Sequence, residues 1–309
     1  MRIAVVGAGA VGSYFGGRLA QAGNEVVFLA RGKHLQALRA GPLSIESIRG
    51  DFAVQVRATD VPEEIGPVDA MLVAVKAWQV REAAEMIPPM LHARSVVIPL
   101  QNGVEAPGVL ADVLGRDAVA GGLCKIIAYV VAPGHVRHVG AEPFVAFGEL
   151  TPPSASERLV KLRREFVRAG VTCEIPTDIT AAMWEKFIFI ASISGVGAVT
   201  RLPIGRIRSQ AETRAQLERA IEEMVAVALA SNVALPKDTV ACTLAYIDSL
   251  PADGTSSMQR DIMEGRASEL ESQNGAVVRL GRQVGVSTPT HEAIYSELLP
   301  LEHRARGLG

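Results

Sequence analysis

A glycine-rich run near the N-terminus is the first feature that could do chemistry. Gly7-Ala8-Gly9-Ala10-Val11-Gly12 follows the apolar run Arg2 to Val6 and leads into a helical pattern ending at Gln21. A second strand pattern, Glu25 to Leu29, follows. In a dinucleotide fingerprint the three glycines permit a tight turn, close approach of a pyrophosphate and helix–strand packing. The run therefore predicts phosphate binding at a helix N-terminus, and the alternative is an ordinary glycine-rich turn.

The end of the second strand indicates which dinucleotide would bind. NAD-binding proteins usually place Asp or Glu there to accept from a ribose hydroxyl. This chain has Arg31, followed by Gly32 and Lys33. An arginine can pair with a 2′-phosphate through two hydrogen bonds and can stack on an adenine. We therefore predict NADP(H) as the cofactor, and a solvated surface arginine is the alternative.

Polar residues follow two further strand patterns. Lys76 comes directly after the apolar run Asp69 to Val75, and Gln101-Asn102 follow the run Ser95 to Leu100. Ligands of open parallel sheets bind beyond the carboxyl ends of the strands. We expect Lys76 to reach a cofactor phosphate or the nicotinamide side, and Asn102 to bridge a carboxamide, ribose or substrate oxygen. As alternatives, Lys76 is a solvated loop residue and Asn102 a turn former.

The elements that would position these residues indicate an α/β half followed by an all-α half. We predict a Rossmann-type NADP-binding domain over residues 1–175 and a helical substrate and dimerisation domain over residues 176–309. In the first half we also expect a sheet completed by β segments at Ala118 to Ala132 and Pro143 to Glu149. Helices are expected at Met183 to Ile193, Ala211 to Ser231, Lys237 to Ser249 and Ala267 to Val284. A ligand pocket is expected in the cleft between the halves.

Composition excludes several other classes. The 309 residues carry a net charge of -2 and scattered basic residues, so a nucleic-acid partner is not indicated. The three widely spaced cysteines favour a reducing, cytoplasmic location. No continuous apolar run is long enough to span a bilayer. His135 and His138 lie in a β pattern, where metal binding is not expected.

Several motifs in the second half and elsewhere occur together in one known family. The sequence resembles the ketopantoate reductases, NADPH-dependent enzymes that reduce 2-dehydropantoate to (R)-pantoate in pantothenate and coenzyme A biosynthesis. The resemblance covers nearly the whole chain. It rests on the GAGAVG run, Val75-Lys76-Ala77-Trp78-Gln79, Gln101-Asn102-Gly103, Trp184-Glu185-Lys186, Ser256-Ser257-Met258 with Asp261, Ser268-Glu269-Leu270 and Asn274-Gly275.

The resemblance implies roles for individual residues. Lys186 corresponds to the catalytic acid, and Glu269 to a glutamate that contacts substrate and cofactor. Ser257 corresponds to the serine that binds the substrate carboxylate. Asn102 would serve both substrate and cofactor. By the same resemblance Ser194 is assigned to the substrate and Lys76, Gln79 and Ile127 to the cofactor.

The physical chemistry of Lys186 agrees with such a role. Hydride addition to a ketone builds negative charge on its oxygen, which a proton donor stabilises. Lys186 precedes the apolar run Phe187 to Ile190, so partial burial is expected to lower its pKa toward the working pH. A lysine snorkelling from a buried helix is the alternative. Ser257 is expected just before a helix, where a hydroxyl and free amides favour a carboxylate; a simple N-cap is its alternative.

The sequence departs from the family at the substrate wall. Ketopantoate reductases usually carry asparagines where this chain has Ile190, Ser194 and Ile204. The wall is therefore less polar than in the family, which favours a more apolar 2-oxo acid as an alternative substrate. A second alternative is a non-catalytic NADP-binding sensor. We also expect that the apolar stretches Ala220 to Ala230 and Ala276 to Leu280 could form a homodimer surface.

Overall fold

The computed structural model describes residues 1–308, which form two compact units. The α/β unit contains Met1–Gln101 and Ala106–Ile179. The helical unit contains Asn102–Glu105 and the chain from Thr180 onward. The boundary expected between residues 175 and 176 lies just before the point where the main chain passes from one unit to the other.

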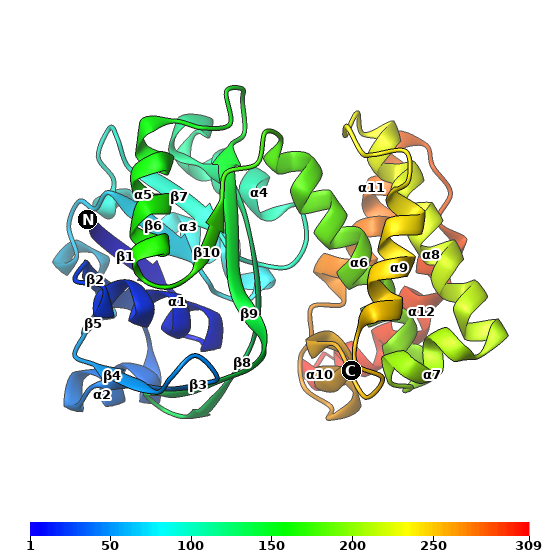
Figure 1. The fold of residues 1–309 in the computed structure, drawn as a ribbon, viewed down its shortest axis with the longest axis horizontal. Helices are drawn as coiled ribbons and strands as arrows, with labels where there is room; N and C mark the ends of the chain where they lie inside the picture. The colour runs from blue at the N-terminus through cyan, green and yellow to red at the C-terminus, as the bar shows by residue number, and fades with distance from the viewer. Residues whose placement is uncertain (309) are drawn as a thin grey trace. The chain divides into compact units, whose positions relative to one another are not determined.

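A parallel sheet forms the centre of the α/β unit (Figure 1). Its strand order is β5-β2-β1-β6-β7, and every neighbouring pair is parallel. The carboxyl ends therefore share one edge, which confirms the predicted Rossmann-type fold. The strands are β1 (Arg2–Val6), β2 (Glu25–Leu29), β5 (Arg57–Thr59), β6 (Ala70–Val73) and β7 (Val96–Pro99).

Helices cover both faces of this sheet because its strands are apolar on both sides. Ile3 and Val5 of β1 belong to a core shared with α1 and α5, and Ala4 and Val6 belong to a second core shared with α3 and α4. The helices of the unit are α1 (Ala10–Gln21), α2 (Gly32–Ala40), α3 (Val80–Met86), α4 (Ala106–Leu114) and α5 (Glu157–Arg168). Short 3-10 turns lie at Pro62–Glu64, Ala77–Gln79, Pro88–Met90 and Arg116–Ala118.

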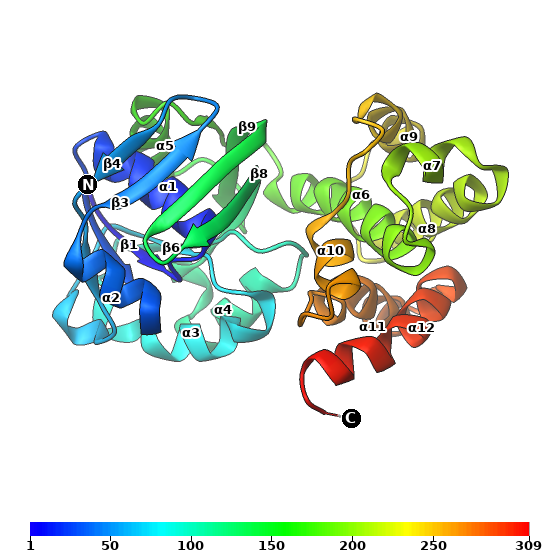
Figure 2. The ribbon, with the colours of Figure 1, turned by 90° about the horizontal axis from the view of Figure 1, so that it is seen from below.

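A second sheet, rather than an extension of the first, takes up the remaining strands. Its order is β10-β9-β3-β4, with β8 antiparallel to β9. Figure 2 shows β3, β4, β8 and β9 of this sheet. The strand expected at Pro143 to Glu149 begins earlier, at His135. Gly134 turns the chain with φ +75°, and His135 pairs directly with Ala132 of the preceding strand. On β9, His138 contacts Ser47 and Ala141, whereas His135 pairs with Glu46. The strands are β3 (Leu43–Ser47), β4 (Phe52–Val54), β8 (Ala120–Ala132), β9 (His135–Glu149) and β10 (Thr172–Glu174).

The helical unit is built around one long apolar helix, α6. It begins and ends well outside the expected Met183 to Ile193 and has the length and composition of a membrane span, with a mean hydropathy of 1.3. However, 67% of its most apolar 18-residue stretch is buried inside the protein, as expected for a helix in a protein core. The helices are α6 (Ile179–Thr200), α7 (Ile204–Ser209), α8 (Ala211–Ala230), α9 (Thr239–Ser249), α10 (Ser257–Met263), α11 (Ala276–Val284) and α12 (Pro289–Ala305).

The apolar stretches expected to form a dimer surface lie instead in the core of this unit. In α8, Ile221, Met224 and Val227 are fully buried, and in α11 Val277 is 1% exposed. Of the large side chains in these stretches, Leu229 is an exception, with 54% exposure. Packing within the chain thus already removes most of this apolar area from water, and the homodimer stays a prediction.

Candidate active site

The glycine run forms a cradle that only glycine can build at two of its positions. Gly7 has φ +99°, and a Cβ there would lie 2.8 Å from the backbone nitrogen of Val75. A Cβ at Gly12 would lie 2.1 Å from the carbonyl oxygen of Gly7. At Gly9, by contrast, a Cβ would meet no atom of the described residues within 4 Å. The cradle is therefore closely packed on the protein side and open at Gly9.

The start of α1 completes this cradle. No described side chain caps the helix N-terminus, and its first turn contains no acidic residue. The first N–H groups of the helix and its positive dipole end are thus suited to an anion. Behind the turn, the Ser13 hydroxyl donates to the Ala8 carbonyl at 2.9 Å. These features fit the pyrophosphate of a dinucleotide, with Gly9 at the point of closest approach.

His34 supports the cradle from α2. Its Nδ1 accepts from the Gly134 amide at 3.2 Å, so the ring proton lies on Nε2, which faces the Ser13 hydroxyl at 3.2 Å. Burial lowers the pKa of His34 below its usual value. A neutral imidazole therefore links three segments around the turn. No sequence pattern indicates that His34 contacts Ser13 and Gly134.

Arg31 stands at the N-terminus of α2 and pairs with a residue that the sequence did not indicate. Its Nη1 donates to Glu82 Oε1 at 2.6 Å, and its Nη2 contacts Met86 Sδ at 2.9 Å. Glu82 and Met86 are one turn apart on α3, so the guanidinium lies along that helix. Both members of the ion pair are more than half exposed.

The other residues assigned to the cofactor, and the strand-end residue Gln101, lie at different places in the α/β unit. Lys76 and Gln79 share the turn after β6, where the Lys76 amide donates to Gln79 Oε1 at 3.4 Å. Gln101 is 7% exposed and donates to the carbonyls of Val73 and Val75, which joins the ends of β6 and β7. Ile127 lies apart from this edge, in the middle of β8, with 41% exposure.

Asn102 and Glu269 meet in the helical unit although 167 positions separate them. Asn102 Nδ2 donates to Glu269 Oε2 at 3.3 Å. Glu269 is 9% exposed, and only its Oε2 atom takes part in this hydrogen bond. A buried carboxylate next to a primary amide offers both acceptors and donors to a polar ligand.

Glu269 lies in a bend, and the helix expected over Ala267 to Val284 is wrong in its first part. A π-helix occupies Glu271–Gly275, and α11 begins only at Ala276. The Ser268 amide donates to both carboxylate oxygens of Glu302, at 3.0 Å each, and the Ser268 hydroxyl accepts from the Leu270 amide at 3.2 Å. Ser268 therefore caps the turn that follows it, and the Gly275 amide bonds to the Leu270 carbonyl, five positions back, as in a π-helix. π-turns of this kind are frequent at functional sites.

Lys186, Ile190 and Ser194 form one stripe of α6, since they are four residues apart on a helix. Lys186 and Ile190 are half-buried, whereas Ser194 is fully buried. The Ser194 hydroxyl has no hydrogen-bond partner among the described residues. The adjacent Glu185 is exposed. The lysine thus stands at the accessible end of a stripe that becomes progressively more buried.

Ser257 is the first residue of α10 and is exposed. The position just before the helix, where we expected it, belongs to Ser256, whose hydroxyl accepts from the Gln259 amide at 3.1 Å. Ser256 is therefore the N-cap, and the Ser257 hydroxyl is not used for capping. At the third departure from the family pattern, Ile204 begins α7 and is 8% exposed.

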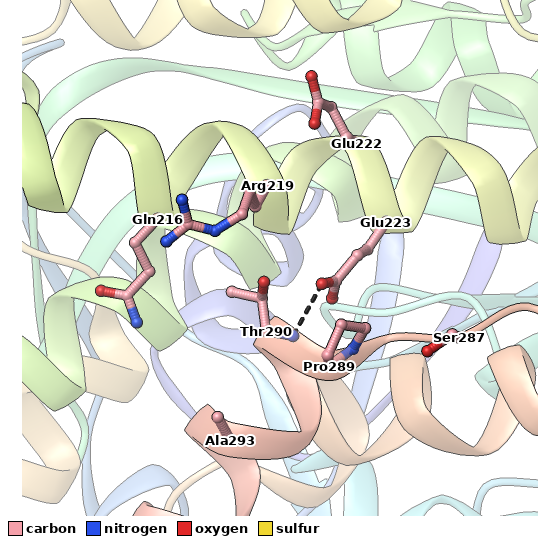
Figure 3. A pocket seen from close by; sticks show the side chains of 8 residues that line it. All are labelled: Gln216, Arg219, Glu222, Glu223, Ser287, Pro289, Thr290 and Ala293. Carbon is pink, nitrogen blue, oxygen red and sulfur yellow. Dashed lines mark hydrogen bonds between the residues drawn. The ribbon is translucent and has the colours of Figure 1, made fainter.

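A separate cavity of about 650 Å³ lies on the helical unit, and it contains none of the predicted site residues (Figure 3). It is lined by α8 and the start of α12. Glu223 points toward Thr290 and accepts from the amides of Thr290 and His291. That carboxylate already caps α12, and Arg219 and Glu222 give the lining mixed charge.

Comparison with known proteins places the chain in a family. The family "Ketopantoate reductase PanE/ApbA" matches residues 3–152, and its C-terminal counterpart matches residues 178–302. The chain is 30% identical to "Uncharacterized oxidoreductase YkpB" of Bacillus subtilis over 96% of its length and 98% of the relative's. It is 27% identical to a 2-dehydropantoate 2-reductase of Nostoc, with 99% and 96% covered.

Solved structures agree. A PanE/ApbA family ketopantoate reductase from Ralstonia eutropha superposes with a TM-score of 0.89 at 33% identity, covering 99% of this chain and 100% of that one. The two family matches, the named relatives and the superposed structure all indicate the same family. The protein belongs to the ketopantoate reductase family of oxidoreductases that act on CH–OH groups.

Proposed function

We propose that this protein reduces a 2-oxo acid to a 2-hydroxy acid with NADPH, and that 2-dehydropantoate is its substrate. The observation that carries the proposal is the pairing of Asn102 with the buried carboxylate of Glu269 in the unit that also bears Lys186. The names of its relatives and the open cradle at Gly9 support it. The product would then be (R)-pantoate, made in the cytoplasm for pantothenate biosynthesis.

The proposal assigns a task to each of these residues, and Asn102 and Glu269 contact the cofactor as well as the substrate. NADPH, held by Gly7 to Gly12, Arg31 and Lys76, supplies the hydride when bound. The Lys186 ammonium donates a hydrogen bond to the ketone oxygen and then its proton, because negative charge develops there. Glu269 and Asn102 orient the substrate, and Ser257 binds its carboxylate. Gln79 and Ile127 add contacts to the cofactor and Ser194 to the substrate.

A variant of Lys186 tests the chemistry. Lys186→Met keeps an unbranched apolar side chain but removes the proton donor, so kcat should fall by about 10²- to 10⁴-fold. Lys237→Met, at an exposed position of the same unit, is the matched control and should retain wild-type rates. Equal NADPH consumption in wild type and Lys186→Met would instead support the non-catalytic sensor.

A more apolar 2-oxo acid is the second candidate substrate, favoured by Ile190 and Ile204. The substrate pair that separates the two is 2-dehydropantoate and its analogue without the hydroxyl group, 3,3-dimethyl-2-oxobutanoate. A site built to bond that hydroxyl rejects the analogue strongly, by a factor of up to about 10⁴ in kcat/KM. A preference for the analogue, or for an aryl 2-oxo acid, would overturn 2-dehydropantoate as the substrate and leave the reductase chemistry standing.

A further inference from the structure

Four residues that follow β7 leave the α/β unit and pack within the helical unit. They are Asn102–Glu105, and the chain returns to the α/β unit at Ala106. A Cβ at Gly103 would lie 3.0 Å from the Ser272 carbonyl oxygen. The backbone of this segment therefore lies close against the π-helix Glu271–Gly275, called the π-turn below. Val104 packs on the helical core. The segment therefore holds Asn102 next to Glu269 through contacts that neither residue makes itself.

Arg279 on α11 links this segment to the π-turn. Its Nη2 donates to Glu105 Oε2 at 2.8 Å and to the carbonyl oxygen of Glu271 at 3.3 Å, and its Nη1 donates to the Glu271 carboxylate. The Tyr295 hydroxyl donates to the other carboxylate oxygen of Glu271. One guanidinium thus joins the segment that begins with Asn102 to the turn that begins two residues after Glu269.

The planar geometry of the guanidinium group explains why an arginine is needed at position 279. A guanidinium presents several donors in a fixed plane, so it can bond two carboxylates and a carbonyl at once, which a lysine cannot do with the same geometry. Arg279 is 40% exposed, and its two carboxylate partners lie in segments far apart in the sequence. Such a link determines relative position more than it determines stability.

We propose that Arg279 is a positioning residue for the reaction, which sets the distance between Asn102 and Glu269 by clamping Glu105 to the π-turn. The inference rests on the proposed function, in which Asn102 and Glu269 orient the substrate. Arg279 itself would touch neither substrate nor cofactor. Its loss would displace Asn102, and small displacements of orienting groups reduce rates strongly.

Hydrogen exchange tests the clamp without reference to activity. In Arg279→Met, amides of the peptide spanning residues 270–276 should exchange at least about tenfold faster than in wild type, because the π-helix is no longer held; its Gln273 and Gly275 amides donate to the carbonyls of Glu269 and Leu270. The matched control is Arg214→Met: Arg214 also bonds two carboxylates, Glu218 and Asp248, but in another part of the helical unit. Unchanged exchange in Arg279→Met, or equal acceleration in both variants, would overturn the clamp.

Steady-state kinetics test its consequence. With NADPH and the preferred 2-oxo acid, Arg279→Met should lower kcat/KM by about 10- to 100-fold, whereas Arg214→Met should not change it. Arg279→Lys should recover little. In an Asn102→Ala background the further loss from Arg279→Met should shrink to less than about threefold, because the positioned group is already gone.

The outcomes separate the two proposals. A wild-type protein that reduces no 2-oxo acid would refute the proposed function, and the exchange experiment would still decide on the clamp. An active wild type in which the losses from Asn102→Ala and Arg279→Met simply multiply would refute the positioning role alone. Faster exchange of residues 270–276 with unchanged kinetics would likewise refute the positioning role.

Discussion

Arg31 and Glu82 form an ion pair with Nη1 and Oε1 2.6 Å apart. The residue proposed to recognise the cofactor's 2′-phosphate is thus already engaged by a carboxylate of α3. A phosphate that binds Arg31 must displace Glu82 or share the guanidinium with it, and the two anions would repel each other. In the proposed function, Glu82 would therefore oppose NADPH selectivity while Arg31 would favour it.

Substitution of either residue should change cofactor preference in opposite directions. Arg31→Ala should weaken NADPH binding by about 10- to 100-fold and NADH binding much less, since only the former carries the phosphate. Glu82→Gln should strengthen NADPH binding by up to about fivefold, the modest effect expected of an exposed pair. Dissociation constants from cofactor fluorescence, measured at two salt concentrations, would check both. Equal effects on NADH and NADPH would contradict a phosphate contact.

Gly9 offers a variant that separates cofactor binding from folding. Its backbone, with φ -69° and ψ -171°, is accessible to alanine, and a Cβ there meets open space. Gly9→Ala should therefore keep wild-type stability but reduce NADPH affinity at least about tenfold, because the methyl group occupies the approach to the pyrophosphate. Gly12→Ala is the comparison: its Cβ would overlap the Gly7 carbonyl, so it should also unfold more easily. Undiminished affinity in Gly9→Ala would exclude this position for the pyrophosphate.

Ser194 predicts a trade-off between stability and binding. Its buried hydroxyl has no hydrogen-bond partner among residues 1–308, so Ser194→Ala should raise the free energy of unfolding by about 1 kcal/mol and raise KM for the 2-oxo acid. Ser192, equally buried on α6, contacts Met224 Sδ at 3.4 Å and provides the control. Ser192→Ala should leave KM unchanged. A Ser194→Ala protein that is more stable with unaltered KM would remove Ser194 from the substrate site.

His291 predicts a loss of stability below neutral pH. Its Nδ1 accepts from Asn274 and its Nε2 donates to the Ala220 carbonyl, both at 3.0 Å, while Glu223 bonds its backbone amide. Burial lowers the pKa of His291 below its usual 6.5. As pH falls through 6.5, the unfolded chain therefore gains a proton that the folded protein does not, and stability present above that pH is lost by up to about 1.4 kcal/mol per pH unit.

Urea unfolding between pH 5 and 8 measures this dependence. His291→Gln should show a shallower slope below pH 6.5 than wild type, although it is less stable at pH 8. His303→Gln, at an exposed position, should keep the wild-type slope. The remaining slope of His291→Gln includes His34, whose pKa burial also lowers. Identical slopes in wild type and His291→Gln would show that His291 is not the titrating group.

Local patterns were sufficient for most elements of the chain and for the glycine turn. The turn at Gly7, the strand β1 and the helix α1 depend on residues within a span of about 20 positions, and the sequence placed them correctly. The start of α11 was misplaced: Ser268, held by the Glu302 carboxylate, caps the following turn, and a π-helix at Glu271–Gly275 precedes α11. Propensity counts neighbours along the chain and does not register a carboxylate that arrives from another helix.

The sequence by itself determined the Rossmann-type half, the helical half and the residue types available for chemistry, because periodicity and glycine sterics act over short distances. Only the tertiary structure decided which of those residues meet. It brought Asn102 to Glu269 and Glu105 to Arg279 in the helical unit, and it joined Arg31 to Glu82 on α3. Hydrogen bonds and ion pairs form wherever folding brings partners within about 3 Å, and sequence separation carries no information about that distance.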